Sequence, residues 1–366
     1  MSELSCWAVG YYFASGRAQT LIEHWDGTSW AVVDSPNTSS THDNILSSVT
    51  CSSSECWAVG YSFNGGGAWR TLIVHWDGNS WAIVDSPNTS TTESNRLTDV
   101  TCNSDSECWA VGYYKPSTLW QTMIVRWNGT SWVIVSSPNA DTTQNNVLAG
   151  LTCVSSSDCW AVGSYYTIGI PAKNQTLIEH WNGTSWAIVE SPDTPIALNT
   201  LNFLSSVSCV SSSDCWAVGY YKPLNRWQTL IEHWDGDSWA IVISPNSLIT
   251  EDNRLSSVSC VSSSDCWAVG DYFKSGIGLD GGVGQTLIEH WDGTSWTVVK
   301  TPSSSTTQSN RLVGVSCVSA SECWAAGYHR NEGGVDQALI EHWDGTSWTI
   351  VNSPNALVAQ HNRLSG

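Results

Sequence analysis

Short runs of alternating apolar and polar residues predict β-strands along the whole chain. Residues 255–260 (LSSVSC) and 215–221 (CWAVGYY) are two such runs, and 229–234 (TLIEHW) and 238–242 (SWAIV) are two more. An Asp-Gly pair joins the last two runs, which is the strongest short signal for a β-hairpin. A Ser-Pro pair ends the fourth run, because proline cannot donate to a strand ladder. We therefore expect four antiparallel strands in each unit.

The same set of four runs recurs seven times. The sequence CWAVG or CWAAG opens each second strand at intervals of 50 to 57 residues, at Cys6, Cys56, Cys108, Cys159, Cys215, Cys266 and Cys323. Repeats of this length that consist of strands are typical of propeller blades. We predict an all-β fold, a seven-bladed β-propeller with four-stranded antiparallel blades. A parallel β-solenoid is the alternative, and Asp-Gly hairpins do not suit it.

Residues 1–366 then form a single domain of seven repeats of about 52 residues each. The triplet 362–364 restarts the pattern of a first strand, so we expect the ring to close by pairing of the N- and C-terminal segments. The formal net charge of -19 disfavours nucleic acid and anionic membrane surfaces as partners. No run of 18 apolar residues occurs, so we predict no membrane insertion.

The cysteines predict disulfides between the first and second strands of a repeat. The expected pairs are Cys51 with Cys56, Cys102 with Cys108, Cys153 with Cys159, Cys209 with Cys215, Cys260 with Cys266, and Cys317 with Cys323. Zinc is the alternative, but no second cysteine or histidine pair lies near any of these in the sequence. Cys6 has no partner in its own repeat, so we expect a free thiol there. Six disulfides predict a secreted or cell-surface protein.

Charge and aromatic residues separate the two ends of each blade. Connections between second and third strands, and those leading to the next blade, emerge on one face, which we call the loop face; the others emerge on the turn face. The loop face should hold Trp69, Trp120 and Trp227, the three tryptophans outside the repeated positions. Exposed aromatic rings beside cations can stack on sugars or anchor proteins. The alternative is that each ring folds onto a tyrosine of its own second strand.

Arginines of the N-R-L triplets should lie near the mouth of the central channel. We therefore predict a ligand-binding set on the loop face, which consists of Trp69, Trp120, Trp227, Arg96, Arg254, Arg311, Arg363, Lys115, Lys222 and Arg226. Two longer connections, 193–201 and 275–284, are expected to be surface decoration. We predict no catalytic residues, no metal and no cofactor.

Histidines, glutamates and tryptophans at repeated positions favour structural roles. Six histidines precede the hairpin tryptophan, and Arg126 replaces the histidine in the third copy. A residue present in six copies is more often a hydrogen-bonding tie than a catalyst, because catalysis needs groups with distinct roles. The glutamate one position earlier should point to the opposite side of the strand. Tryptophans at three fixed positions should fill the space between blades.

The string HWDGTSW at 24–30 is similar to the hairpin of Asp-box and kelch-type propeller repeats. Over its full length the chain resembles highly repetitive bacterial propellers that include seven-bladed lectins. This resemblance implies sugar binding, and it implies sialidases as enzymatic relatives, in which an arginine cluster binds a carboxylate. No Tyr and Glu pair stands out here as a nucleophile.

We accordingly predict a secreted protein that is not an enzyme and binds carbohydrate, such as a cell-surface glycan, in a lectin-like, multivalent manner through the loop face. Weak sites repeated around a rigid ring gain affinity through avidity. A protein-protein interaction scaffold is the first alternative, and a sialidase-like glycan hydrolase is the second.

Overall fold

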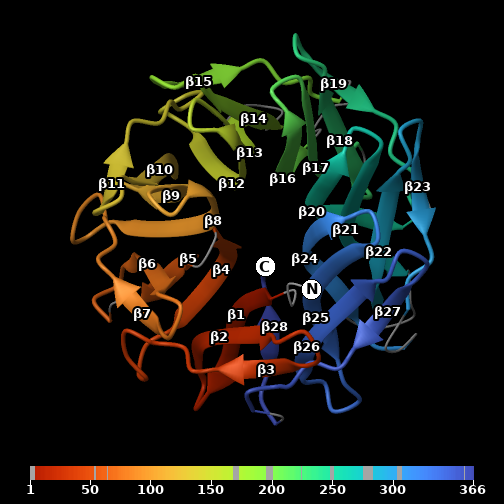
Figure 1. The fold of residues 1–366 in the computed structure, drawn as a ribbon. Helices are drawn as coiled ribbons and strands as arrows, with labels where there is room; N and C mark the ends of the chain where they lie inside the picture. The colour runs from red at the N-terminus through yellow and green to blue at the C-terminus, as the bar shows by residue number, and fades with distance from the viewer. Residues whose placement is uncertain are drawn as a thin grey trace. The chain divides into compact units, whose positions relative to one another are not determined.

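The computed structural model describes residues 5–52, 55–63, 65–167, 173–194, 201–223, 225–247, 251–274, 283–302, 307–357 and 359–366. Within these ranges the chain consists of β-strands joined by turns and loops, and no helix occurs among them (Figure 1). Most of the two longer connections, 195–200 and 275–282, lies outside the described residues. Their predicted role as surface decoration stays a prediction.

The strands follow the four runs predicted for each repeat. In the first half of the chain they are β1 (Cys6–Ala14), β2 (Arg17–Trp25), β3 (Trp30–Val33), β4 (Asn44–Cys51), β5 (Cys56–Phe63), β6 (Trp69–Trp76), β7 (Trp81–Val84), β8 (Ser94–Ser104), β9 (Glu107–Lys115), β10 (Gln121–Trp127), β11 (Trp132–Val135), β12 (Asn145–Ser155), β13 (Asp158–Thr167), β14 (Lys173–Trp181) and β15 (Trp186–Val189). In the second half they are β16 (Leu201–Ser211), β17 (Asp214–Lys222), β18 (Gln228–Trp234), β19 (Trp239–Val242), β20 (Asp252–Ser262), β21 (Asp265–Lys274), β22 (Val283–Trp291), β23 (Trp296–Val299), β24 (Asn310–Ser319), β25 (Glu322–Arg330), β26 (Asp336–Trp343), β27 (Trp348–Val351) and β28 (Asn362–Leu364).

The prediction of seven separate four-stranded blades is wrong. The described residues form six hydrogen-bonded sheets, of which five have four strands and one has eight. The eight-stranded sheet arises because β14 pairs in parallel with β16, where Asn174 lies opposite Leu201. Asn174 also donates from Nδ2 to the carbonyl oxygen of Asn202 at 3.1 Å, which strengthens this junction.

The first sheet contains both ends of the described chain. Strand β28 lies antiparallel to β1, with Leu364 opposite Gly10 and Asn362 opposite Tyr12 (Figure 1). Because β28 has only three residues, it stops well short of Cys6 and supplies no cysteine opposite it.

The chain divides into two compact units. Unit 1 comprises Met1–Ala161, Glu179–Val189 and Ser353–Gly366, and unit 2 comprises Val162–Ile178 and Glu190–Asn352. In unit 2 the ring centroid of Trp216 lies 4.7 Å from that of Trp291 and 5.4 Å from that of Trp296, both in the next repeat. The prediction that repeated tryptophans fill the space between neighbouring repeats is confirmed at this contact.

All six predicted disulfides are present. Each joins the end of a first strand to the start of a second strand across a Cα separation of 4.0 Å, and Cys6 takes part in none of them. Because these twelve cysteines are bonded to one another in pairs, the alternative of zinc binding by them is wrong. Disulfides of this number are typical of proteins in oxidising compartments.

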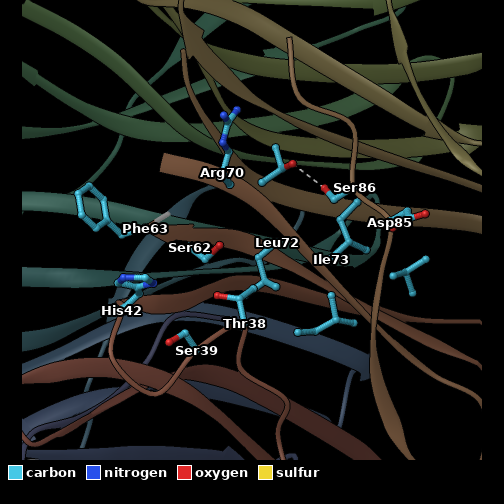
Figure 2. Close-up of a pocket in the computed structure, with 13 residues that line it drawn as sticks. Thr38, Ser39, His42, Ser62, Phe63, Arg70, Leu72, Ile73, Asp85 and Ser86 are labelled. Atoms are coloured by element: carbon cyan, nitrogen blue, oxygen red, sulfur yellow. Dashed lines mark hydrogen bonds between the residues drawn. The ribbon is translucent and has the colours of Figure 1, made fainter. Parts of the chain in front are cut away.

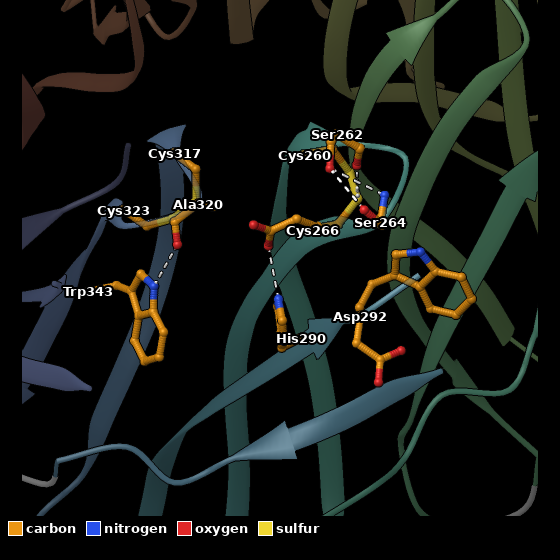
Figure 3. A network of polar contacts seen from close by, with 12 residues as sticks. Cys260, Ser262, Ser264, Cys266, His290, Asp292, Cys317, Ala320, Cys323 and Trp343 are labelled. Carbon is orange, nitrogen blue, oxygen red and sulfur yellow. Dashed lines mark hydrogen bonds and ion pairs between the residues drawn. A yellow bond between two sulfur atoms is a disulfide. The ribbon is translucent and has the colours of Figure 1, made fainter. Parts of the chain in front are cut away.

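The repeated histidines are structural, as predicted. His290 stacks on Trp267 with ring centroids 4.1 Å apart. Its Nε2 lies 2.9 Å from Oδ1 of Asp265, the contact drawn as a dashed line from His290 in Figure 3. Trp343 donates its indole N–H to the carbonyl oxygen of Ala320 at 3.0 Å. These contacts join the third strand of a repeat to the loop that the disulfide closes. Most of the histidines pair with carboxylates of the turn face. In the third repeat Arg126 takes the place of the histidine and pairs with Glu107.

Five repeats bury a glutamate one position before the histidine or its equivalent, at Glu23, Glu179, Glu232, Glu289 and Glu341. Their side chains are fully buried and take no part in the histidine contacts, as predicted. Four of them accept a hydrogen bond from a serine that follows a fourth strand, among them Glu289 from Ser244 at 2.9 Å and Glu232 from Ser191 at 2.8 Å. Val74 and Val125 occupy the same position in the second and third repeats.

Candidate functional site

A pocket of about 370 Å³ opens in unit 1 at the loop-face ends of β5, β6 and β7. One wall is the segment 38–42, which leads from β3 to β4, and the other is formed by side chains of the second repeat. The lining combines hydroxyl groups with His42, Phe63 and Arg70 (Figure 2). The rings of His42 and Phe63 meet edge to face, with centroids 6.4 Å apart.

The pocket occurs where one repeat departs from the others at two facing positions. Ser62 lies opposite Asn44 in the strand register, a place that Tyr12, Tyr114, Tyr221, Tyr272 and His329 take in five other repeats. Arg70 faces Ser62 in the register, whereas a glutamine faces the large ring in each of those repeats. Replacing a ring by a serine hydroxymethyl group leaves space, and replacing glutamine by arginine adds a positive charge beside it.

Hydrogen bonds hold the wall 38–42 in place. Oδ1 of the buried Asn44 accepts from the backbone N–H of Thr38 at 2.9 Å, and its Nδ2 donates to the carbonyl oxygens of Ser39 at 3.0 Å and His42 at 2.9 Å. Gln19 also donates to the carbonyl oxygen of His42, at 2.8 Å. The wall is therefore fixed before any ligand arrives, which lowers the entropic cost of binding.

Arg70 is fixed as well. Its two terminal nitrogens donate to the carbonyl oxygens of Ser90 and Thr91, which orients the guanidinium at the edge of the pocket. On the opposite side Ser86 donates to Oγ1 of Thr71 at 2.6 Å (Figure 2). Oriented hydroxyl, imidazole and guanidinium groups around one aromatic ring can accept and donate hydrogen bonds to a polar ligand that has an apolar face.

In unit 1 the structure brings four of the predicted ligand residues together. Arg96 places its guanidinium carbon 4.8 Å from the ring centroid of Trp69 and 5.7 Å from that of Trp120. Nζ of Lys115 lies 5.3 Å from the Trp120 ring. Trp69 also meets Tyr61 edge to face, with ring centroids 5.1 Å apart. The Trp69 ring therefore folds onto a tyrosine of its own second strand, which is the alternative to an exposed ring that the sequence left open. Both tryptophans remain half-buried.

Unit 2 repeats this arrangement with three further predicted residues. Arg254 and Lys222 each place their charged group 5.1 Å from the ring centroid of Trp227, and Trp227 meets the edge of Tyr220. Here the position opposite Asn202 holds Tyr221, a large ring, where the second repeat of unit 1 has Ser62.

The remaining predicted ligand residues have other surroundings. Nε of Arg311 lies 3.0 Å from Oδ1 of the buried Asp271, so this arginine is already paired with a carboxylate. Arg363 donates to the hydroxyl group of Tyr11 at 3.1 Å, and Arg226 is exposed. The binding role of all these residues stays a prediction.

The ligand-binding set predicted from the sequence contains none of the pocket residues Ser62, Phe63, His42 and Arg70. The signal for the pocket in the sequence is a departure from the repeat at one position. Six repeats carry Gln before the Thr-Leu, Ala-Leu or Thr-Met of the third strand, and the second repeat carries Arg there. A serine draws no attention by itself. It becomes informative only beside the larger residues that take its place elsewhere.

Solved structures share the fold of this chain. An ulvan lyase, described as a new family of polysaccharide lyase, has a TM-score of 0.56 at 8% identity, with 94% of this chain and 92% of that chain covered. The polysaccharide lyase Uly1 has a TM-score of 0.53 at 8% identity, over 85% and 82% of the two chains. A fungal lectin from Aleuria aurantia, described as a six-bladed β-propeller with a fucose recognition mode, has a TM-score of 0.49 at 13% identity, over 85% and 96%; that score is too low to carry an argument.

The likenesses to the two polysaccharide lyases show a shared fold and nothing beyond the fold, because the identities are low. They overturn the expectation that the protein is not an enzyme, since the same fold serves polysaccharide lyases. No protein-family model matches the sequence, and no curated protein matches it. Among the described residues no helix is long and apolar enough to cross a membrane.

Proposed function

We propose that this protein binds carbohydrate outside the cell, at the pocket formed by segment 38–42 and the second repeat. The observation that carries the proposal is the paired change to Ser62 and Arg70 at a polar pocket beside Phe63, where five other repeats carry a large ring and a glutamine. A sugar ring presents hydroxyl groups at its edge and C–H groups on its face, which match this lining. The six disulfides support a location in an oxidising compartment.

Restoring the residues of the other repeats should remove binding without unfolding the protein. We expect the double variant Ser62→Tyr with Arg70→Gln to lose at least about tenfold in affinity, because the ring fills the pocket and a charge-assisted donor is lost. The measurement is a glycan panel followed by titration calorimetry on the best ligand. Lys300→Gln removes one positive charge elsewhere and should bind as the parent does.

The same glycan panel also tests the two alternative functions, glycan cleavage and protein-protein interaction. Cleavage is followed through new reducing ends and through the ultraviolet absorbance of the unsaturated sugar that a lyase releases. A parent protein that binds no glycan, or a double variant that binds as tightly as the parent, contradicts the proposal. Silence on the panel together with specific capture of a protein would support the interaction scaffold instead.

A further inference from the structure

The pocket continues into a line of rings and cations on the same unit. Phe63 of the pocket faces Trp69 in the strand register, and their ring centroids are 5.3 Å apart. Trp69 lies beneath Arg96, which also covers part of Trp120, and Lys115 lies above the Trp120 ring. We call Phe63, Trp69, Arg96, Trp120 and Lys115 the strip. It extends from the sugar pocket across two repeats.

The strip and the pocket edge are cationic in a strongly acidic protein. Arg70, Arg96 and Lys115 are half-buried, and in the part of the chain that the structure describes no carboxylate lies within ion-pair distance of any of them. Nε of Arg96 is buried and makes no hydrogen bond to a described residue. With a net charge of -19 the protein has many carboxylates, yet within the described ranges none pairs with these three cations.

We infer that the strip binds an extended anionic oligosaccharide whose terminal unit occupies the pocket. This inference rests on the proposed function of that pocket. Carboxylate or sulfate groups of the following units would accept hydrogen bonds from Arg96 and Lys115, and the sugar faces would contact Phe63 and the exposed parts of Trp69 and Trp120. A guanidinium that is held between rings suits a planar or tetrahedral oxyanion, because its fork of donors is already oriented.

The test compares oligomers of one, two and four units in three chemical classes: galacturonic acid, sulfated galactose and unmodified galactose. We expect either anionic tetramer to bind at least about tenfold more tightly than both its monomer and the neutral tetramer. The carboxylate and sulfate series show which anion the strip prefers. Affinities are measured by calorimetry at one fixed salt concentration, because exposed charges are screened by salt.

Variants locate the effect. Arg96→Gln with Lys115→Gln should remove the gain of the anionic tetramer and leave the monomer affinity unchanged. Lys115→Gln alone, at the end of β9, should reduce the tetramer affinity about threefold and keeps the test valid if the double variant does not fold. Lys173→Gln with Lys300→Gln removes the same charge elsewhere and should have no effect.

The outcomes separate this inference from the proposed function. Equal binding of neutral and anionic tetramers, or an equal loss in the Lys173 and Lys300 control, overturns the anionic strip; the pocket survives if Ser62→Tyr with Arg70→Gln still abolishes binding. If no oligomer of any class binds the parent, the anionic strip falls, and the pocket falls with it only when the glycan panel is silent as well.

Discussion

Replacing Gly270 by alanine is expected to lower the free energy of unfolding of the protein by about 3 kcal/mol or more. A Cβ atom on this residue would lie 2.0 Å from the carbonyl oxygen of Arg254 and 2.9 Å from Cα of Leu255. The close approach arises from a β-bulge, since the register between β20 and β21 shifts between Leu255 and Ser257. Both neighbours are backbone atoms, so no side-chain rotation can relieve the collision.

Gly284 provides the matched control, because it lies on the strand next to Gly270. Its added Cβ would meet Phe273 at 3.5 Å, which is ordinary van der Waals contact, so Gly284→Ala should change stability by less than about 1 kcal/mol. Guanidinium denaturation followed by tryptophan fluorescence measures both variants. Equal midpoints for the two would mean that the bulge can relax, and the proposed reason for this glycine would be wrong.

The sequence predicts the strands well and the sheets less well. Alternation, the Asp-Gly turns and the cysteine spacing place strands, hairpins and disulfides correctly, because each depends on neighbours close in the chain. Oδ1 of Asp292, for instance, accepts from the backbone N–H groups of Thr294 at 2.8 Å and Ser295 at 2.9 Å, and Gly293 adopts a φ of +87°. Two repeats join into one sheet because Asn174 pairs with Leu201, and no local sequence pattern predicts that pairing.

The candidate site shows a second limit of reasoning from sequence. Tryptophans and cations of the loops can be recognised in the sequence as residue types, and the structure does group Trp69, Arg96, Trp120 and Lys115. The pocket, however, depends on what the second repeat lacks, which is the ring that Ser62 replaces. Its size also depends on the wall 38–42, which comes from the preceding repeat through the hydrogen bonds of Asn44.

The buried glutamates make the stability of the protein depend on pH. Burial raises the pKa of Glu179, Glu232, Glu289 and Glu341 from 4.5 to about 8 and that of Glu23 to about 7. The serine hydrogen bonds of four of them, all but Glu341, only partly oppose this rise in pKa. The folded protein therefore keeps protons that the unfolded chain releases above its own carboxyl pKa. The stabilisation is complete below pH 4.5 and is lost as the pH rises through the folded values of about 7 to about 8.

We therefore expect the midpoint of thermal unfolding to fall as the pH is raised from about 5.5 to about 8.5, with each retained proton contributing about 1.4 kcal/mol per pH unit. Glu289→Gln mimics the protonated side chain and should make the fall shallower by the share of one proton, and combining it with the same change at Glu179 and Glu232 should flatten it further. Asp292→Asn is the control. Backbone hydrogen bonds lower the pKa of this exposed carboxyl below 3.8, so it does not titrate between about pH 5.5 and about pH 8.5. Asn182 takes the same turn position in the fourth repeat, which shows that the turn accepts asparagine. Calorimetric scans across this interval measure the midpoints. A midpoint that stays constant in the parent, or a slope that Glu289→Gln leaves unchanged, would show that these carboxyls do not retain their protons in the folded protein.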